Sequence, residues 1–411
     1  MSASASAVPF HSLADLGWDD AWAATLATAV QLLGPADPAR VGRVDLGACT
    51  VLGASGASRV TIPPGTTVAV GDWVLVRRSV VIGALPRRTA IVRRSAGLDP
   101  QAQTLAANVD TVLVLVAADG RVSPRSVERY VTLVWESGAT PVVVLTKADL
   151  VSGDDLDDAI ERLEPACARP GVGQGPHALE EPGVGAPGGT AKPPEASGGA
   201  RSAPDAVDLL VVSAPTGVGV ADVARYLGRG RTVALLGSSG AGKSTLANHL
   251  AGAALATGAV REGDQRGRHT TTHREIVPLP GGGVLIDSPG LREVGLWQAA
   301  PSGSRRLDRG DTPRPPGDGI ARTFPEITAL LDQCRFTDCS HRKEPGCAVT
   351  AAVADGKITQ ERLASWRKLR RELDRLAARD DPALRQQQRT EQRRLYREYA
   401  QARKQYRRQG R

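Results

Sequence analysis

Midway through the chain the sequence reads Gly237-Ser238-Ser239-Gly240-Ala241-Gly242-Lys243-Ser244-Thr245. This is the complete GxxxxGK[ST] pattern of a phosphate-binding loop, preceded by an apolar strand pattern at 233–236 and followed by a helical pattern at 246–250. Glycines let backbone N–H groups turn toward phosphate oxygens, and the helix N-terminus adds positive potential. We expect Lys243 to reach the β- and γ-phosphates and Ser244 to ligate Mg²⁺. The motif therefore predicts an α/β domain that binds a nucleoside triphosphate. We prefer this interpretation to the alternative of a glycine-rich turn that matches the pattern by chance.

Two further segments bear on which base is bound. Thr146-Lys147-Ala148-Asp149 follows the strand pattern at 141–145. The Asp149 carboxylate can accept two hydrogen bonds from guanine that adenine cannot supply, and losing such a pairing gives strong base discrimination. The alternative is that Asp149 caps a helix. Ser213-Ala214 follows another strand pattern and can present a backbone N–H to the guanine carbonyl.

A fourth motif, Asp287-Ser-Pro-Gly290, follows the strand pattern at 283–286 and has the form DxxG. There Asp287 holds Mg²⁺ through water and Gly290 senses the γ-phosphate. The motif order is unusual, because the base-reading segments precede the phosphate loop. The same sheet can form with its ends joined and cut elsewhere. We therefore predict a circularly permuted GTPase domain over residues 98–297, whose γ-phosphate-sensing loop leads directly into the C-terminal region.

The C-terminal region contains four metal-ligand residues at close spacing, namely Cys334, Cys339, His341 and Cys347. Three thiolates and one imidazole make a closed tetrahedral site that suits structural zinc rather than a catalytic metal. The alternative is three ordinary thiols in a short loop. Cys49 and Cys167 we interpret as incidental. We place an α-helical zinc domain at 320–380.

The region before the GTPase domain has a different pattern. Residues 40–97 hold five or six short strand patterns between turns, at 41–44, 60–62, 68–70, 73–76, 80–82 and 90–92. Such spacing predicts a small β-barrel. Arginine pairs punctuate it at 77–78, 87–88 and 93–94, which fits either nucleic-acid binding or a solubilising surface. Residues 1–39, rich in alanine and serine, we expect to be a mobile N-terminal extension.

Composition and charge limit the remaining possibilities. Of the 411 residues 41% are hydrophobic, which excludes a fully disordered chain. The longest apolar run, 111–118, is far shorter than the ~18 residues of a membrane span, so we expect a soluble protein. Residues 357–411 hold 18 lysines and arginines against 7 acidic residues. This basic tail, 381–411 above all, predicts a polyanionic partner or a solvated helix end. The stretches 165–206 and 298–319 are rich in glycine and proline and predict flexible loops.

Several segments together resemble the ribosome small-subunit-dependent GTPase A family. They are the permuted motif order, GRHTTT (267–272), DSPG (287–290) and CRFTDCSHRKEPGC (334–347) followed by AVTAAVADGKI. LPRRTAIVRRS (85–95) and LAANVDTVLVLVA (105–117) look like that family's passage from an OB-fold into the permuted GTPase domain. The resemblance covers residues 40–376.

The resemblance implies an OB-fold, a GTPase domain and a zinc domain that dock on the small ribosomal subunit and its rRNA during late assembly. It implies GTP hydrolysis to GDP stimulated by that subunit, with Mg²⁺ and one zinc per chain. We therefore expect a cytoplasmic, monomeric protein with no membrane partner.

Three features concern catalysis. Thr146 stands where the family usually has Asn, which bears on GTP affinity more than on base identity. Leu291 follows DxxG where many GTPases have a water-positioning Gln, so we expect slow intrinsic hydrolysis. In the GRHTTT segment the family places a threonine on Mg²⁺, and we favour Thr272 over Thr271. His269 there either positions water or orders the loop.

Two other functions stay open at this point. One is an RNA-binding module whose GTP site is regulatory and barely hydrolytic, which Leu291 leaves open. The other is a P-loop kinase or ATPase acting on a small molecule, against which Asp149 and Ser213-Ala214 argue.

Overall fold

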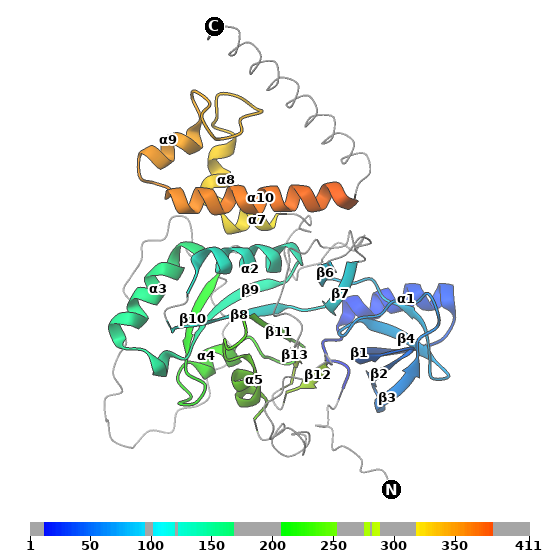
Figure 1. The fold of residues 1–411 in the computed structure, drawn as a ribbon. Coiled ribbons are helices and arrows are strands. Elements are labelled where there is room, and N and C mark those ends of the chain that lie inside the picture. Colours follow the sequence, from blue (N-terminus) through cyan, green and yellow to red (C-terminus); the bar gives the residue numbers. More distant parts are fainter. Residues whose placement is uncertain are drawn as a thin grey trace.

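Three structural parts follow one another along the chain in Figure 1: a β-barrel with one helix, a central α/β sheet, and a group of C-terminal helices. The computed structural model describes residues 12–94, 102–119, 122–167, 207–252, 275–279, 282–287 and 318–380. The order of the parts is the predicted one.

The barrel consists of five strands, β1 (Asp37–Asp45), β2 (Ala48–Gly53), β3 (Gly56–Thr61), β4 (Trp73–Arg77) and β5 (Val80–Ala84). They pair in the order β1-β2-β3-β5-β4, and β4 pairs again with β1, which closes the barrel. Its interior is filled by buried β-branched side chains, Val41, Val51, Val60, Val74 and Val81. The predicted small β-barrel is confirmed.

Three details of this region differ from the prediction. Strand β2 was not among the predicted strands, and its Cys49 is fully buried in the barrel core. The apolar run at 68–70 is not a strand, because a turn forms there in which the Ala69 N–H donates to the Asp72 carboxylate. The pattern at 90–92 belongs to β6 (Ala90–Arg94), which pairs with β7 (Ala102–Ala107) in a separate two-stranded sheet.

The segment before the barrel is packed against it, although we expected a mobile extension. Helix α1 (Asp20–Leu33) begins after Asp19, whose carboxylate accepts the Trp22 N–H at 2.9 Å. Trp18 and Trp22 stack beside Trp73 of the barrel, with ring centroids 4.7 and 6.3 Å from it. Aromatic residues bury large areas, and this contact orders residues 12–39. Residues 1–11 lie outside the described residues.

The central sheet contains four neighbouring parallel strands, β10 (Asp208–Val212), β9 (Thr140–Thr146), β8 (Thr111–Ala117) and β11 (Thr232–Gly237), in that order. Beyond β11 follow β13 (Val284–Asp287), parallel to it, and β12 (Glu275–Pro278), antiparallel to β13. Arg43 of β1 pairs with Glu275 of β12 and so joins the barrel to this sheet. All the strands predicted here are present, and β12 is an addition.

Helices cover both faces of this sheet, as Figure 1 shows. One face carries α2 (Pro124–Glu136) and α3 (Gly153–Cys167), and the other carries α4 (Val220–Ala224) and α5 (Lys243–Ala251). Side chains alternate between the faces. Val112 and Val114 pack with α2, whereas Leu113 and Leu115 belong to the cluster that contains α5.

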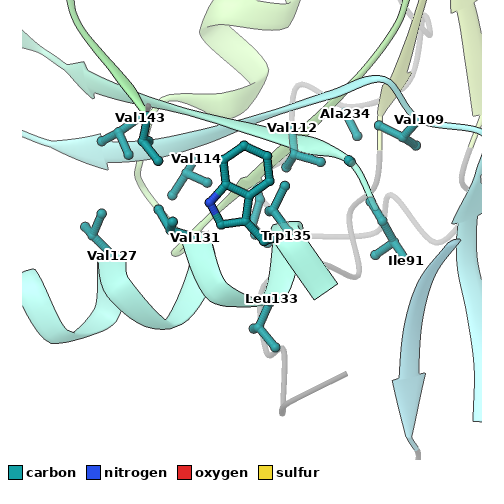
Figure 2. Close-up of a cluster of buried hydrophobic side chains, with 14 of the residues drawn as sticks. Ile91, Val109, Val112, Val114, Val127, Val131, Leu133, Trp135, Val143 and Ala234 are labelled. Atoms are coloured by element: carbon teal, nitrogen blue, oxygen red, sulfur yellow. The ribbon is translucent and has the colours of Figure 1, made fainter. Parts of the chain in front are cut away.

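Figure 2 shows how α2 is held on its face of the sheet. Val131 and Trp135 point toward Val112 and Val114 of β8, and Leu133 points to the opposite side of the helix. Leu133 is nevertheless fully buried, because the C-terminal helices cover that side. Helix α2 is therefore apolar on two sides and is enclosed between the sheet and the C-terminal part.

The C-terminal part contains α7 (Gly319–Thr323), α8 (Pro325–Leu331), α9 (Ala348–Ala354) and α10 (Gln360–Asp380). Helix α10 begins at Gln360, and just before it the Thr359 hydroxyl accepts the Arg362 N–H at 3.1 Å. Most of the predicted flexible stretches, 168–206 and 298–317, and the tail 381–411 lie outside the described residues; residues 165–167 close α3. Within the described ranges, no helix combines the length and apolarity needed to cross a bilayer.

Candidate nucleotide site and metal cluster

Three of the sequence motifs meet at one edge of the central sheet. Because β10, β9, β8 and β11 are consecutive parallel strands of one sheet, their carboxyl ends lie at the same edge. Thr146–Asp149 follow β9, Ser213-Ala214 follow β10, and the phosphate-loop sequence follows β11. The permuted order of motifs along the chain is thus compatible with one site in space.

A cavity of about 170 Å³ lies at this edge. Its walls come from all three motifs: Lys147 and Asp149, then Ala214, then Gly242 and Thr245. Leu150 and Pro215 complete it on the apolar side, and these two walls were not predicted. Ligand pockets are typically lined mainly by apolar side chains, with a few placed polar groups that fix the orientation of the ligand.

The loop at 237–242 can adopt its path only because of its glycines. A Cβ on Gly237 would lie 2.5 Å from the Leu115 carbonyl oxygen, and Gly240 and Gly242 have φ of +80° and +82°. Lys243 opens α5, and its ammonium donates to the carbonyl oxygens of Gly237 and Ser238 at 2.7 and 2.6 Å. Lys243 therefore spans the mouth of the loop.

Asp149 does not cap the helix that follows it. The N-terminus of α3 is capped by Ser152, whose hydroxyl accepts the Asp155 N–H at 3.2 Å. Asp149 instead lies in the short 3₁₀ turn Ala148–Leu150, beside Lys147 with φ of 60°, and its side chain is exposed at the cavity. The geometry favours the base-contact interpretation over the capping one.

The segment after β10 contributes one of its two predicted residues to the cavity. The Ser213 N–H donates to the Val218 carbonyl at 3.0 Å, so it is engaged within its own loop. Of the two predicted residues, Ala214 is the one that lines the cavity.

The predicted catalytic residues fall mostly outside the part of the chain that the structure describes. His269, Thr272 and Gly290 are in this group, as is Leu291. Asp287 is the last residue of β13, two strands from β8 across β11. Their catalytic roles stay predictions.

The four predicted metal ligands form one cluster. One ligand atom from each of Cys334, Cys339, His341 and Cys347 lies within 4.8 Å of all the others. The Cys334 Sγ lies 3.9 Å from the Cys347 Sγ and 3.4 Å from the His341 Nδ1, and Cys347 Sγ lies 3.6 Å from that nitrogen.

Cys347 lies at the N-cap of α9, where it accepts the Thr350 N–H at 3.5 Å. Burial raises the pKa of its thiol, but hydrogen bonds from Thr350 and His341 outweigh burial and lower that pKa to about 6. A helix N-terminus also favours thiolate, which is the form that binds metals.

Helix α10 connects this cluster to the GTPase part. The Trp366 ring meets the His341 ring edge-on at 5.7 Å, and Arg367 donates to the His341 carbonyl. One turn earlier, Arg362 bonds to Glu128 of α2 at 2.7 Å. This contact could not be predicted from the sequence, because its partners lie 234 positions apart and leave no local pattern.

Comparison with known proteins agrees with this architecture. A family model described as RsgA GTPase matches residues 84–172 and 200–297. The "Small ribosomal subunit biogenesis GTPase RsgA" of Streptomyces coelicolor is 40% identical over 407 residues, 96% of this chain and 95% of that protein. The RsgA of Xanthomonas campestris is 39% identical over 382 residues, 89% of each chain.

Two solved structures share the fold. YjeQ from Thermotoga maritima matches 82% of this chain and 99% of its own, with a TM-score of 0.52 and 21% identity. YloQ, described as a circularly permuted GTPase, matches 84% and 97%, with a TM-score of 0.51 and 19% identity. The barrel, the permuted sheet and the extent of the 40% identity lead to one conclusion: this chain belongs to the RsgA GTPase family, and it is a GTP-hydrolysing enzyme.

Proposed function

We propose that this chain binds GTP and Mg²⁺ at the strand-end site and hydrolyses GTP while docked on the small ribosomal subunit, during late maturation of that subunit. The observation that carries the proposal is the single cavity walled by Asp149, Ala214 and Gly242, because it joins the base-reading segments to the phosphate loop. The names of the relatives support the subunit as the partner.

The proposed contacts follow from the chemistry of each group. Asp149 accepts the N1–H and N2–H₂ of guanine, and the Ala214 amide donates to the guanine carbonyl. The Lys243 ammonium has three donors. Two of them hold the Gly237 and Ser238 carbonyls at the mouth of the loop, and the ammonium is the group that we propose contacts the β- and γ-phosphates. Ser244 and Asp287 are the proposed Mg²⁺ partners.

Hydrolysis needs a positioned water, and the residue after DxxG is Leu291, which has no polar group. We therefore place the missing part of the catalytic machinery in the docked complex, together with His269, Thr272 and Gly290. With an apolar residue in this place, the free enzyme hydrolyses GTP slowly, and faster hydrolysis depends on docking to the small subunit.

The experiment that tests this proposal measures GTP turnover by the full chain under four conditions: alone, with purified small subunits, with large subunits and with rRNA. We expect a several-fold or larger rise with small subunits and no rise with large ones. The control variant Lys243→Ala should show no turnover in any mixture, because its phosphate contact is lost.

Two results would contradict the proposal. Turnover that stays negligible both with and without small subunits would favour the RNA-binding alternative with a regulatory GTP site. Faster turnover of ATP than GTP would favour the kinase or ATPase alternative. We also propose that the chain acts in the cytoplasm as a monomer and has no membrane partner.

The donor set and spacing of the cysteine cluster fit zinc. With Zn–S of ~2.3 Å and Zn–N of ~2.0 Å, tetrahedral ligand atoms stand ~3.8 Å (S–S) and ~3.5 Å (S–N) apart. The three distances in the structure, 3.9, 3.4 and 3.6 Å, agree with these values. Cys334, Cys339, His341 and Cys347 would hold the ion, whose contribution is to fix the loop between α8 and α9.

Removal of that zinc gives a second prediction. Metal analysis of the purified chain should find one zinc per molecule, and chelation or Cys339→Ser should remove it. Amide exchange should then accelerate across residues 332–354, because structural zinc supplies the folding free energy of such loops. GTP affinity should change far less, since the cluster and the nucleotide cavity share no residue.

The control variant for that experiment is Thr337→Ala, an exposed position in the same loop. It should retain zinc and amide protection. A chain purified without chelators that contains no zinc would refute the assignment.

A further inference from the structure

A second cavity lies at the edge of the central sheet opposite the nucleotide site. Its volume is about 610 Å³, within the range of ~300–1,000 Å³ that takes small molecules. Asp110, which precedes β8, and Thr232, the first residue of β11, line it, so it lies where these strands begin. The N-terminal segment, the barrel and the turn before β11 supply other walls, through Trp18, Arg40, Trp73, Arg88 and Arg231.

The Arg40 guanidinium is a buried charge in the wall of this cavity. Arg40 is 1% exposed, and its three nitrogens donate one hydrogen bond each, to the carbonyl oxygens of Leu16, Gly71 and Asn108. A guanidinium has five N–H donors, so two of them have no acceptor among the described residues. None of the described carboxylates forms an ion pair with Arg40 either. Burial lowers the pKa of Arg40 to about 10, so it still carries its charge at neutral pH.

The Thr232 hydroxyl is a second buried polar group in this wall, and it has no hydrogen-bond partner in the part of the chain that the structure describes. Thr232 is 1% exposed, and its backbone N–H donates to the Asp110 carboxylate at 2.8 Å. A Cβ added to Gly17 would lie 3.0 Å from the Arg40 Nη1 and 3.8 Å from the Thr232 hydroxyl oxygen. The buried guanidinium and the buried hydroxyl are therefore close neighbours.

The arginines of this wall carry more positive charge than the nearby carboxylates balance. Two of them are paired with carboxylates at 2.6 Å, Arg88 with Asp19 and Arg229 with Asp15. Arg231 is exposed and forms no ion pair with any described residue. Arg40 and Arg231 thus remain against a single carboxylate in the cavity wall, Asp110. The cavity is therefore electropositive and favours an anion.

We propose that this cavity binds a small phosphate monoester, whose phosphate group is held by Arg40 and Thr232. A buried charge without a counter-ion costs free energy, and a phosphate monoester supplies about two negative charges near pH 7. Its oxygens accept hydrogen bonds from guanidinium and hydroxyl groups. The cavity is much larger than a phosphate ion, and Trp18 and Trp73 give it an apolar wall for a body of the size of a sugar.

The test uses the full chain with saturating GDP and Mg²⁺, so that the phosphate loop is already occupied. Ribose 5-phosphate is titrated in, and the indole N–H signals of the tryptophans are followed by NMR. Trp18 and Trp73 line the cavity, so their signals should shift saturably at millimolar concentrations. The Trp366 signal should stay in place, because that ring lies in α10 beside His341. Ribose, which lacks the phosphate, should cause no saturable shift.

Variants of the cavity wall assign the phosphate contact. Arg40→Met should weaken binding of ribose 5-phosphate by about tenfold or more, because hydrogen bonds to a charged group are lost. Thr232→Val keeps the side-chain shape, removes the hydroxyl and should weaken binding about fivefold. The matched control is Arg125→Met, which removes an exposed arginine from α2, outside the cavity, and should leave the affinity unchanged. If Arg40→Met fails to fold, Thr232→Val carries the test.

Three results would overturn the phosphate site. They are the lack of a saturable shift at Trp18 and Trp73, equal affinity for ribose and ribose 5-phosphate, and native affinity in Thr232→Val. None of them bears on the proposed GTPase function, because GDP occupies the nucleotide site throughout. Failure of that function would instead appear as a native chain that does not bind GDP.

Discussion

Replacing Asp149 by asparagine is expected to weaken GTP binding about a hundredfold or more, because two hydrogen bonds to a charged acceptor are lost. The same change should strengthen binding of xanthosine triphosphate. Its base has a carbonyl at C2 in place of the amino group, and the asparagine amide donates to that oxygen. The expectation rests on Asp149 lining the cavity while Ser152 caps α3.

Calorimetric titration of both nucleotides gives the ratio that tests this assignment. The matched control is Asp154→Asn, which removes one exposed carboxylate from the first turn of α3, five residues away and outside the cavity. It should bind GTP and xanthosine triphosphate like the native chain. If Asp149→Asn leaves the ratio of the two affinities unchanged, Asp149 does not read the base.

The predictable parts of the fold are those that a local pattern encodes. The phosphate loop, the buried parallel strands and the metal-ligand spacing each leave a signal within about ten residues, and the described parts of all three lie where expected. Strand β2 was missed because its sequence, ACTVLG, mixes polar and small residues. Its inward residues, Cys49 and Val51, are recognisable only once the barrel closes around them.

The N-terminal segment was misjudged for a related reason. The alanine and serine content suggested a mobile segment. However, Leu16, Trp18 and Trp22 are held in place by packing with Trp73, which lies about fifty residues later in the chain. Arg40 completes this contact by donating to the carbonyl oxygens of Leu16 and Asn108. Packing between distant segments overrides composition in such cases.

The site was predicted to a similar extent. Asp149, Ala214 and the phosphate loop were identified by type and spacing, and the structure places them around one cavity. The contact of Thr146 with Ala241 was not foreseen, since it joins residues 95 positions apart. The sequence indicated only that threonine in the place of asparagine bears on GTP affinity, whereas the structure shows that its short branched side chain reaches the loop directly.

The C-terminal part was expected to follow the γ-phosphate-sensing loop. The structure shows that it is also anchored to α2 by buried charges. Arg362 donates to Glu128 and Glu326 at 2.7 Å each and to the Thr323 carbonyl at 2.6 Å. Burial alone lowers the pKa of Arg362, but the hydrogen bonds and charges of Glu326 and Glu128 outweigh it and raise that pKa. Arg362 of α10 therefore stays charged, and it joins α7 and α8 of the C-terminal part to α2.

Replacing Arg362 by methionine is expected to lower the free energy of unfolding by about 3–5 kcal/mol, because Glu128 is left buried without its partner. Urea denaturation of the full chain measures this loss. The control is Lys368→Met, which removes an exposed cation from the same helix and should change stability by less than about 0.5 kcal/mol.

A double variant isolates the interaction from the loss of shape. Glu128→Gln in the Arg362→Met background removes the uncompensated charge and keeps an acceptor for the Ser365 hydroxyl, which bonds to Glu128 in the native chain. The double variant should therefore be more stable than Arg362→Met alone, the pattern of two directly coupled residues. If the two losses simply add, the ion pair does not hold α10 on α2. If the coupling is found, a conformational change that starts at Asp287 or Gly290 cannot move the metal cluster independently of α2, because α10 contacts both through Arg362 and Arg367.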